Sequence, residues 1–150
     1  MATLQEQLAL DLTAAAKGRD AFRLGVIRLL ISAVRYREIE LGAALDDAGV
    51  VQVIGTQIKQ RRDSVEQYTK AGRNELAEKE VREITVLQTY LPQALTPAEL
   101  AALVDAAVAE AGAKSPKEMG AVMKLLTPRI AGRAEGKQVA DAVKARLVPK

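Results

Sequence analysis

The division of the chain is decided at Leu91-Pro92-Gln93-Ala94-Leu95-Thr96-Pro97-Ala98-Glu99, where one helical part must end and another must begin. Pro92 lacks an amide proton and clashes with the preceding turn, so a helix must stop before it. Thr96 and Glu99 have the spacing of a capping box, with Pro97 at the first helical position. The stretch therefore predicts a short connector followed by a sharply defined helix start.

Hydrophobic residues recur at helical spacing on both sides of this connector, and strand-like alternation extends over a few residues at most. The sequence thus predicts an all-α fold, with a four-helix N-terminal domain of residues 1–92 and a small three-helix C-terminal domain of residues 97–150. The expected helices run from about Leu4 to Lys17, from Asp20 to near Gly42, from Asp46 or Asp47 to Gly72, from Asn74 to Pro92, from Thr96 to Gly112, from Ser115 to near Pro128, and from Gly136 onward. Asp20, Asp46 or Asp47, and Asn74 are the expected N-caps of the second, third and fourth helices. The expected inward stripe of the second helix is Leu24, Ile27, Ile31 and Val34.

Three local features refine this picture. Ser115 and Glu118 repeat the capping-box spacing, so Ser115 is expected to cap the sixth helix, which Pro128 should break. Gly55 lies inside the third helix, where glycine costs about 1 kcal/mol relative to alanine. We expect a neighbouring helix to approach closely there, with a hinge as the alternative.

The composition excludes several kinds of chemistry. The chain of 150 residues contains neither Cys nor His, which removes thiolate and imidazole catalysis, disulfides, zinc fingers and iron–sulfur sites. We therefore predict no catalytic residue, no metal site and no cofactor. The carboxylates that crowd the fourth helix are read as a solvated acidic face rather than a Mg²⁺ site.

Charge is distributed unevenly along the chain. Residues 1–92 carry 13 basic and 13 acidic side chains, whereas residues 93–150 carry 9 basic and 6 acidic ones, which accounts for the net charge of +3. An excess of this size is compatible with a polyanionic partner and also occurs in proteins that bind none.

Arg61 lies on the inward-facing stripe of the third helix, and Glu80 and Glu83 lie near the inward face of the fourth. This arrangement predicts a structural ion pair between the two helices. A site for phosphate or substrate at Arg61 is the alternative.

The segment of residues 131–137 places two glycines around Arg133 and just before Lys137, at the start of the last helix. A helix N-terminus with nearby cations suits an anion, although a simple turn between helices explains the pattern as well. If the domain meets RNA, Lys124, Arg129, Arg133 and Lys137 are the expected phosphate contacts.

The N-terminal residues and the hydropathy of the chain indicate where the protein is located. Residues 1–12 lack the basic start of a signal peptide, and the longest uncharged run, residues 84–98, is too short for a bilayer span and holds two prolines. These features predict a cytoplasmic protein without membrane contact.

Several motifs, in their order and spacing, resemble the YqeY family. They are Ile58-Lys59-Gln60-Arg61-Arg62-Asp63-Ser64-Val65-Glu66-Gln67-Tyr68, Ala71-Gly72-Arg73, Leu76-Ala77-Glu78-Lys79-Glu80, Leu87-Gln88, Tyr90-Leu91-Pro92, Met119-Gly120-x-Val122-Met123 and Gly132-Arg133-Ala134-x-Gly136-Lys137. The resemblance covers essentially the whole chain.

YqeY proteins are similar to the C-terminal tail of the B subunit of the glutamine-dependent Asp/Glu-tRNA amidotransferase, a helical appendage that contacts tRNA. The resemblance therefore implies a two-part helical fold and a non-catalytic tRNA-interacting or adaptor protein. A protein–protein interaction module without RNA binding is the alternative. Carbon–nitrogen ligase activity with glutamine as amido-N-donor, inherited as a family label, comes third. The expected partners are accordingly tRNA or another protein.

Overall fold

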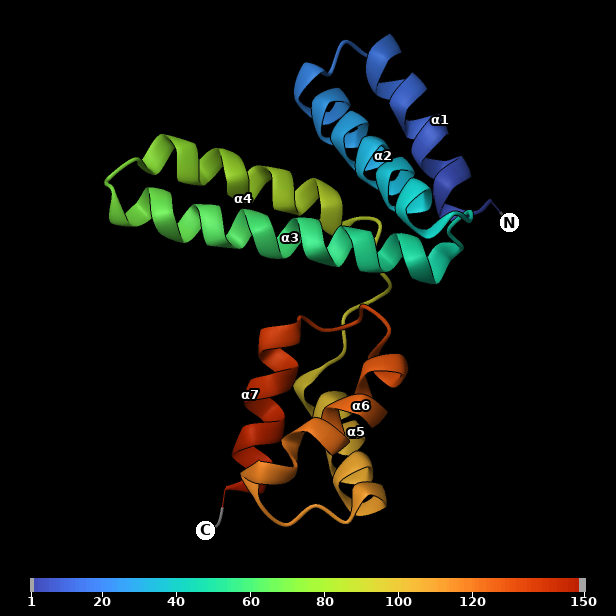
Figure 1. Cartoon of the computed structure of the whole chain (residues 1–150). Coiled ribbons are helices and arrows are strands. Elements are labelled where there is room, and N and C mark those ends of the chain that lie inside the picture. Colours follow the sequence, from blue (N-terminus) through green and yellow to red (C-terminus); the bar gives the residue numbers. More distant parts are fainter. Residues whose placement is uncertain (1, 149–150) are drawn as a thin grey trace. The chain divides into compact units, whose positions relative to one another are not determined.

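The structure is a computed structural model and describes residues 2–148. The chain separates into two compact units that divide between Leu91 and Pro92 (Figure 1). The described residues form seven α-helices and one short 3₁₀ helix, with no strand. This confirms the all-α prediction.

The N-terminal unit consists of two helical hairpins (Figure 1). Its helices are α1 (Leu4–Lys17), α2 (Ala21–Leu41), α3 (Asp47–Lys70) and α4 (Asn74–Gln88). Their inner faces meet in one hydrophobic core, formed by Leu8, Val26, Ile27, Leu30, Val34, Val50, Ile54, Ile58, Ile84, Leu87 and Tyr90. The Tyr90 hydroxyl donates a hydrogen bond of 2.6 Å to the Asp11 carboxylate, and this bond joins the end of α4 to α1. Burial, together with this bond, raises the pKa of Tyr90 to about 12.

Side-chain caps define three of the four helix starts in this unit. Thr3, Asp20 and Asp46 each accept a hydrogen bond from a backbone amide three residues later. The cap predicted at Asn74 is wrong, because Asn74 is the first helical residue and the preceding Arg73 makes no capping bond with its side chain. The helix ends predicted at Gly42 and Gly72 are confirmed by their positive φ angles of 69° and 71°.

The explanation offered for Gly55 is also wrong. A Cβ atom placed on Gly55 would have no atom within 4 Å, so no neighbouring helix approaches it. Gly55 is exposed on the outer face of α3, where nothing in the packing requires glycine.

We expect Gly55→Ala to raise the free energy of unfolding by about 0.5–1 kcal/mol, because alanine loses less backbone entropy than glycine in a helix. Urea denaturation followed by circular dichroism measures the change. Gly42→Ala is the matched control, since its φ of 69° strains alanine and should lower stability. A loss of stability at Gly55 would show that this glycine has a structural role absent from its contacts.

The C-terminal unit packs three α-helices around a separate core (Figure 1). It comprises α5 (Pro97–Ala111), the 3₁₀ helix η1 (Pro116–Glu118), α6 (Met119–Ile130) and α7 (Gly136–Leu147). The capping box at the start of α5 is confirmed in both directions, with Thr96 and Glu99 each accepting from the backbone amide of the other. Gly112 ends α5 at a φ of 64°, as predicted.

Two boundaries of α6 differ from the prediction. The Ser115 side chain makes no capping bond, and residues 116–118 form η1 instead, while Glu118 accepts a hydrogen bond from the backbone amide of Lys114. Pro128 does not break the helix, which continues to Ile130. Pro128 is exposed and falls in the last turn, where it removes one backbone hydrogen bond without interrupting the buried face.

Candidate functional site

A cluster of charged side chains lies between α3 and α4. Arg61 Nη1 lies 3.4 Å from Glu80 Oε2 and also contacts Glu83 Oε2. Lys79 Nζ lies 3.9 Å from the other oxygen of Glu83. The side chains of Arg61, Glu80 and Glu83 are only 13%, 19% and 11% exposed. The structure therefore brings together the three residues that the sequence proposed as an ion pair.

This cluster is arranged for structure more than for ligand binding. Two carboxylates hold the Arg61 guanidinium, and they would repel a phosphate that approached it. The buried Arg61 Nε has no hydrogen-bond partner among residues 2–148, so desolvation of this side chain is only partly compensated. The geometry favours the interhelical ion pair over the phosphate or substrate site.

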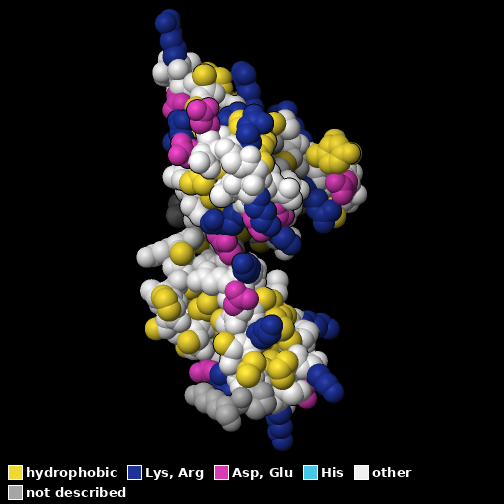
Figure 2. Space-filling view, turned by 90° about the vertical axis from the view of Figure 1, so that its left-hand side faces the viewer, with side chains coloured by type: hydrophobic (Ala, Val, Ile, Leu, Met, Phe, Trp, Pro, Cys, Tyr) yellow, Lys and Arg dark blue, Asp and Glu magenta, His cyan; other side chains and the backbone are white. Residues whose placement is uncertain are grey.

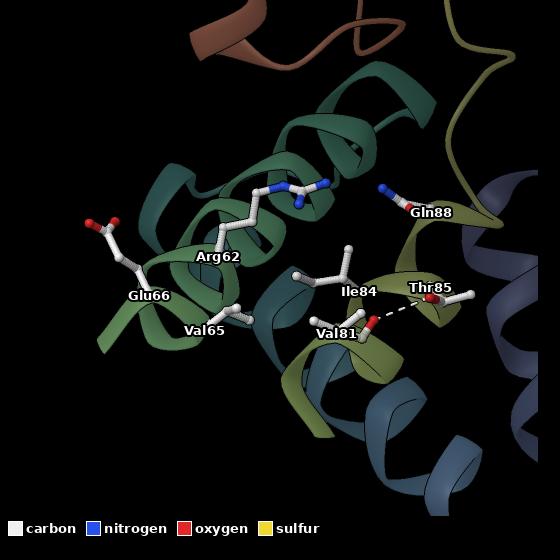
Figure 3. Close-up of a pocket in the computed structure, with 7 residues that line it drawn as sticks. All are labelled: Arg62, Val65, Glu66, Val81, Ile84, Thr85 and Gln88. Atoms are coloured by element: carbon white, nitrogen blue, oxygen red, sulfur yellow. Dashed lines mark hydrogen bonds between the residues drawn. The ribbon is translucent and has the colours of Figure 1, made fainter. Parts of the chain in front are cut away.

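A shallow groove of about 280 Å³ lies between α3 and α4, and none of Arg61, Glu80 and Glu83 lines it (Figure 3). Its hydrophobic floor and polar rim are formed by Arg62, Val65, Glu66, Val81, Ile84, Thr85 and Gln88. In Figure 3 the Arg62 guanidinium and the Gln88 amide extend toward each other, whereas the Glu66 carboxylate points away. The Thr85 hydroxyl is already used, since it donates a 3.1 Å hydrogen bond to the Val81 carbonyl. Sequence reasoning did not identify this groove, because its residues lie far apart along two helices.

In the C-terminal unit, every arginine is paired with an acidic residue of α5. Arg129 donates two hydrogen bonds to Glu110, one of them 2.7 Å long between Nη2 and Oε1. Arg146 Nε donates to Asp105 Oδ1 at 2.7 Å. The third pair joins Arg133 to Glu99. The three arginines therefore connect α6, α7 and the loop before α7 to α5.

Arg133 belongs to the loop of residues 131–135, which precedes α7. Its Nη2 lies 3.5 Å from Glu99 Oε2, and its Nε donates to the Gln93 carbonyl at 2.9 Å. Its own carbonyl accepts a 2.8 Å hydrogen bond from the Leu95 amide. The loop is thus tied to the connector, which supports its reading as a structural turn.

Arginine pairing also changes the carboxylates of α5. The hydrogen bond from the Thr96 backbone holds the pKa of Glu99 below its usual value, and Arg133 adds to this effect. The Arg129 guanidinium lowers the pKa of Glu110 in the same way. Both carboxylates are therefore ionised at neutral pH and able to hold their arginines.

The four cations proposed as phosphate contacts consequently fall into two pairs. Arg129 and Arg133 are engaged by carboxylates, whereas the exposed side chains of Lys124 and Lys137 have no ion pair or hydrogen bond with any residue between 2 and 148. Figure 2 shows Lys and Arg side chains at separate points of the C-terminal unit rather than in one continuous patch on this face. The pairing of the arginines was missed in the sequence, because it depends on how α6 and α7 pack against α5.

The fold and its charged contacts define an all-α protein of two helical units, in which most arginine–carboxylate pairs join one helix to another. The chain belongs to the YqeY family: the family model, described as Yqey-like protein, matches residues 5–147. This confirms the resemblance noted in the sequence.

Curated relatives cover part of the chain. "Altered inheritance of mitochondria protein 41, mitochondrial" of Lachancea thermotolerans is 36% identical over 84 residues, which are 55% of this chain and 45% of that protein. The protein of the same name in Saccharomyces cerevisiae is 30% identical over 111 residues, 69% of this chain and 60% of that protein. An uncharacterized protein of Schizosaccharomyces pombe is 30% identical over 90 residues, 60% of this chain and 73% of its own length. The chain thus spans about half the length of the first of these relatives.

These names correct the predicted location. The relatives from Lachancea thermotolerans and Saccharomyces cerevisiae are named as mitochondrial proteins, and this contradicts the cytoplasmic location predicted from residues 1–12. Within residues 2–148, every helix is too short or too polar to span a bilayer.

Proposed function

We propose that this YqeY-like protein is a non-catalytic module that contacts the phosphate backbone of tRNA through its C-terminal unit, as an RNA-interacting or adaptor protein. The observation that carries the proposal is that the arginines and lysines of this unit differ in their pairing with carboxylates. Carboxylates of α5 engage the arginines, and the lysines that supply the remaining positive charge include the exposed Lys124 and Lys137.

Lysine contacts of this kind define the expected behaviour. An ammonium group neutralises a phosphate as a point charge without reading a base, so affinity depends steeply on salt and weakly on sequence. Aromatic side chains make up only 3% of the chain, so base stacking adds little. In this proposal Arg129 and Arg133 hold the helices in place and contribute to RNA binding indirectly.

We expect Lys124→Ala combined with Lys137→Ala to reduce the slope of log affinity against log salt by about 2, or about 1 per lost phosphate contact. Fluorescence anisotropy with labelled tRNA, titrated over a range of salt concentrations, measures this slope. The matched control is Lys17→Ala with Lys59→Ala, which removes the same charge from exposed positions of the N-terminal unit.

The salt titration distinguishes phosphate contacts by Lys124 and Lys137 from attraction by net charge and from absence of RNA binding. An equal reduction of the slope in both double variants would mean that net charge alone attracts tRNA, and the assigned contacts would be wrong. Absence of binding by the unmodified chain at low salt would reject RNA contact altogether.

A protein-interaction module without RNA binding is the second candidate, and a specific feature favours it. Helix α2 exposes Leu29, Tyr36 and Ile39 to solvent, although one face of a helix suffices to pack it into its unit. Carbon–nitrogen ligase activity is the third candidate. It would require chemistry that a chain without Cys and His supplies poorly.

A further inference from the structure

Helix α2 has two hydrophobic faces. The inner face is buried in the core of the N-terminal unit. Four of the seven large hydrophobic side chains exposed among residues 2–148 also belong to this one helix: Leu29 (58%), Tyr36 (69%), Ile39 (79%) and Leu41 (52%). Single exposed hydrophobic residues are ordinary, but a concentration of them on one element indicates an interaction surface.

Three of these residues form a regular line with an exposed serine. Leu29, Ser32, Tyr36 and Ile39 are separated by three, four and three residues, which is the spacing of a coiled-coil seam. We call these four residues the outer α2 stripe. At 1.5 Å per residue the stripe is about 15 Å long, so it matches a short segment of one helix.

The edges of the outer α2 stripe carry charge asymmetrically. Arg28 and Arg35 precede Leu29 and Tyr36, lie seven residues apart and therefore share one edge. Both arginines are exposed, and neither pairs with a carboxylate among residues 2–148. On the opposite edge, Glu40 is already 3.3 Å from Arg37 of the same helix.

We propose that the outer α2 stripe binds an amphipathic helix of a partner protein, one whose hydrophobic seam is flanked by carboxylates that meet Arg28 and Arg35. The inference deepens the protein-interaction candidate and does not depend on RNA contact by the C-terminal unit. The hydrophobic spacing selects a helix, and the two unpaired arginines select an acidic one.

A second copy of the chain fits the stripe poorly. In an antiparallel pair of α2 helices the same edges meet, which places Arg35 against Arg35 of the other copy. In a parallel pair Arg28 faces Ala33, and Arg35 must take Glu40 from its existing partner Arg37. Charge therefore disfavours self-association.

A bilayer and a single RNA strand fit the outer α2 stripe less well than a helix does. A bilayer surface is bound by helices with a wide hydrophobic face, whereas this stripe is one side chain wide and has Ser32 near its centre. A single RNA strand would be held by stacking aromatics, and the stripe offers Tyr36 alone.

The test uses a synthetic helical peptide of three heptads, with Leu or Ile at the seam positions and Glu at both flanking positions. The control peptide carries Lys at the same flanking positions. Exposed opposite-charge pairs strengthen such a complex modestly, and like-charge pairs weaken it by a similar factor. With two arginines, the full chain should bind the Glu peptide about tenfold more tightly than the Lys peptide in fluorescence anisotropy.

Variants then assign the binding to the stripe. Arg28→Glu with Arg35→Glu should reverse the preference of the chain for the two peptides, whereas Lys17→Glu with Lys59→Glu, the matched control, should leave it unchanged. Ile39→Ser should weaken both peptides and, being exposed, should leave the thermal unfolding midpoint within a few degrees of the original.

Several results would overturn the proposal. These are equal affinity for the two peptides, no reversal in the double arginine variant, stripe-dependent self-association in sedimentation equilibrium, or stripe-dependent binding to phosphatidylserine vesicles. Lys124→Ala with Lys137→Ala should not alter peptide binding. Failure of the RNA proposal is therefore distinguishable from failure of this one.

Discussion

Replacing Glu80 and Glu83 together by glutamine should lower the free energy of unfolding by about 3 kcal/mol, because it leaves the charge of Arg61 buried and unpaired. The Arg61 side chain is 13% exposed, and a guanidinium cannot lose its proton to escape burial. Urea denaturation of the full chain at neutral pH, followed by circular dichroism, measures the loss.

Arg61→Met is expected to cost less than this double substitution. Lys79 remains near Glu83 and partly compensates the charge of that carboxylate. Combining Arg61→Met with both glutamines should recover part of the loss of the double variant, since hydrophobic replacement of a buried ion pair is often neutral.

Two outcomes would contradict this account of the cluster. If Arg61→Met were the more destabilising change, the arginine would contribute more through packing of its stem than through charge. If Arg61→Met left stability unchanged and abolished a binding activity, the residue would be functional, and the phosphate or substrate alternative would hold.

The sequence predicted the helices well where neighbouring residues determine them. Asp20 and Thr96 cap helices through bonds to amides three residues later, and glycines with positive φ end them. Such contacts form within one turn, so spacing along the chain is sufficient to find them. The Arg61 cluster was also within reach, because both of its helices belong to one hairpin.

Predictions that depended on packing between helices were less accurate. The expected inward stripe of α2 included Leu24 and Ile31, but the structure buries Val26 and Leu30 more completely. A helix that is hydrophobic on both sides has no single face that its periodicity can select. For the same reason the sequence did not reveal the outer α2 stripe, because its exposure depends on which other helices pack against α2.

The arginine pairs of the C-terminal unit show a second limit of prediction from the sequence. Arg129 and Glu110 lie 19 residues apart in sequence, and Arg146 and Asp105 lie 41 apart. Their pairing depends on the arrangement of α5, α6 and α7, which no local pattern encodes. The sequence therefore identified four cations but could not separate the two arginines held by carboxylates from the two exposed lysines.

Leu126→Ala is expected to unfold the C-terminal unit while the N-terminal unit stays folded. Leu126 is fully buried in the core that α5, α6 and α7 share, and such a substitution costs about 2–5 kcal/mol. A helical unit of this size has a small margin of stability, so the loss should be a large fraction of it.

The two hydrophobic cores share no residue, which is why the loss should stay within one unit. Hydrogen exchange followed by mass spectrometry should then show rapid exchange in residues 97–147 and unchanged protection in residues 4–88. Leu87→Ala, at an equally buried position of the other core, should give the reverse pattern. If either substitution accelerated exchange in both units, the units would unfold as one cooperative domain, and the two-domain prediction made from Pro92 and Thr96 would be wrong.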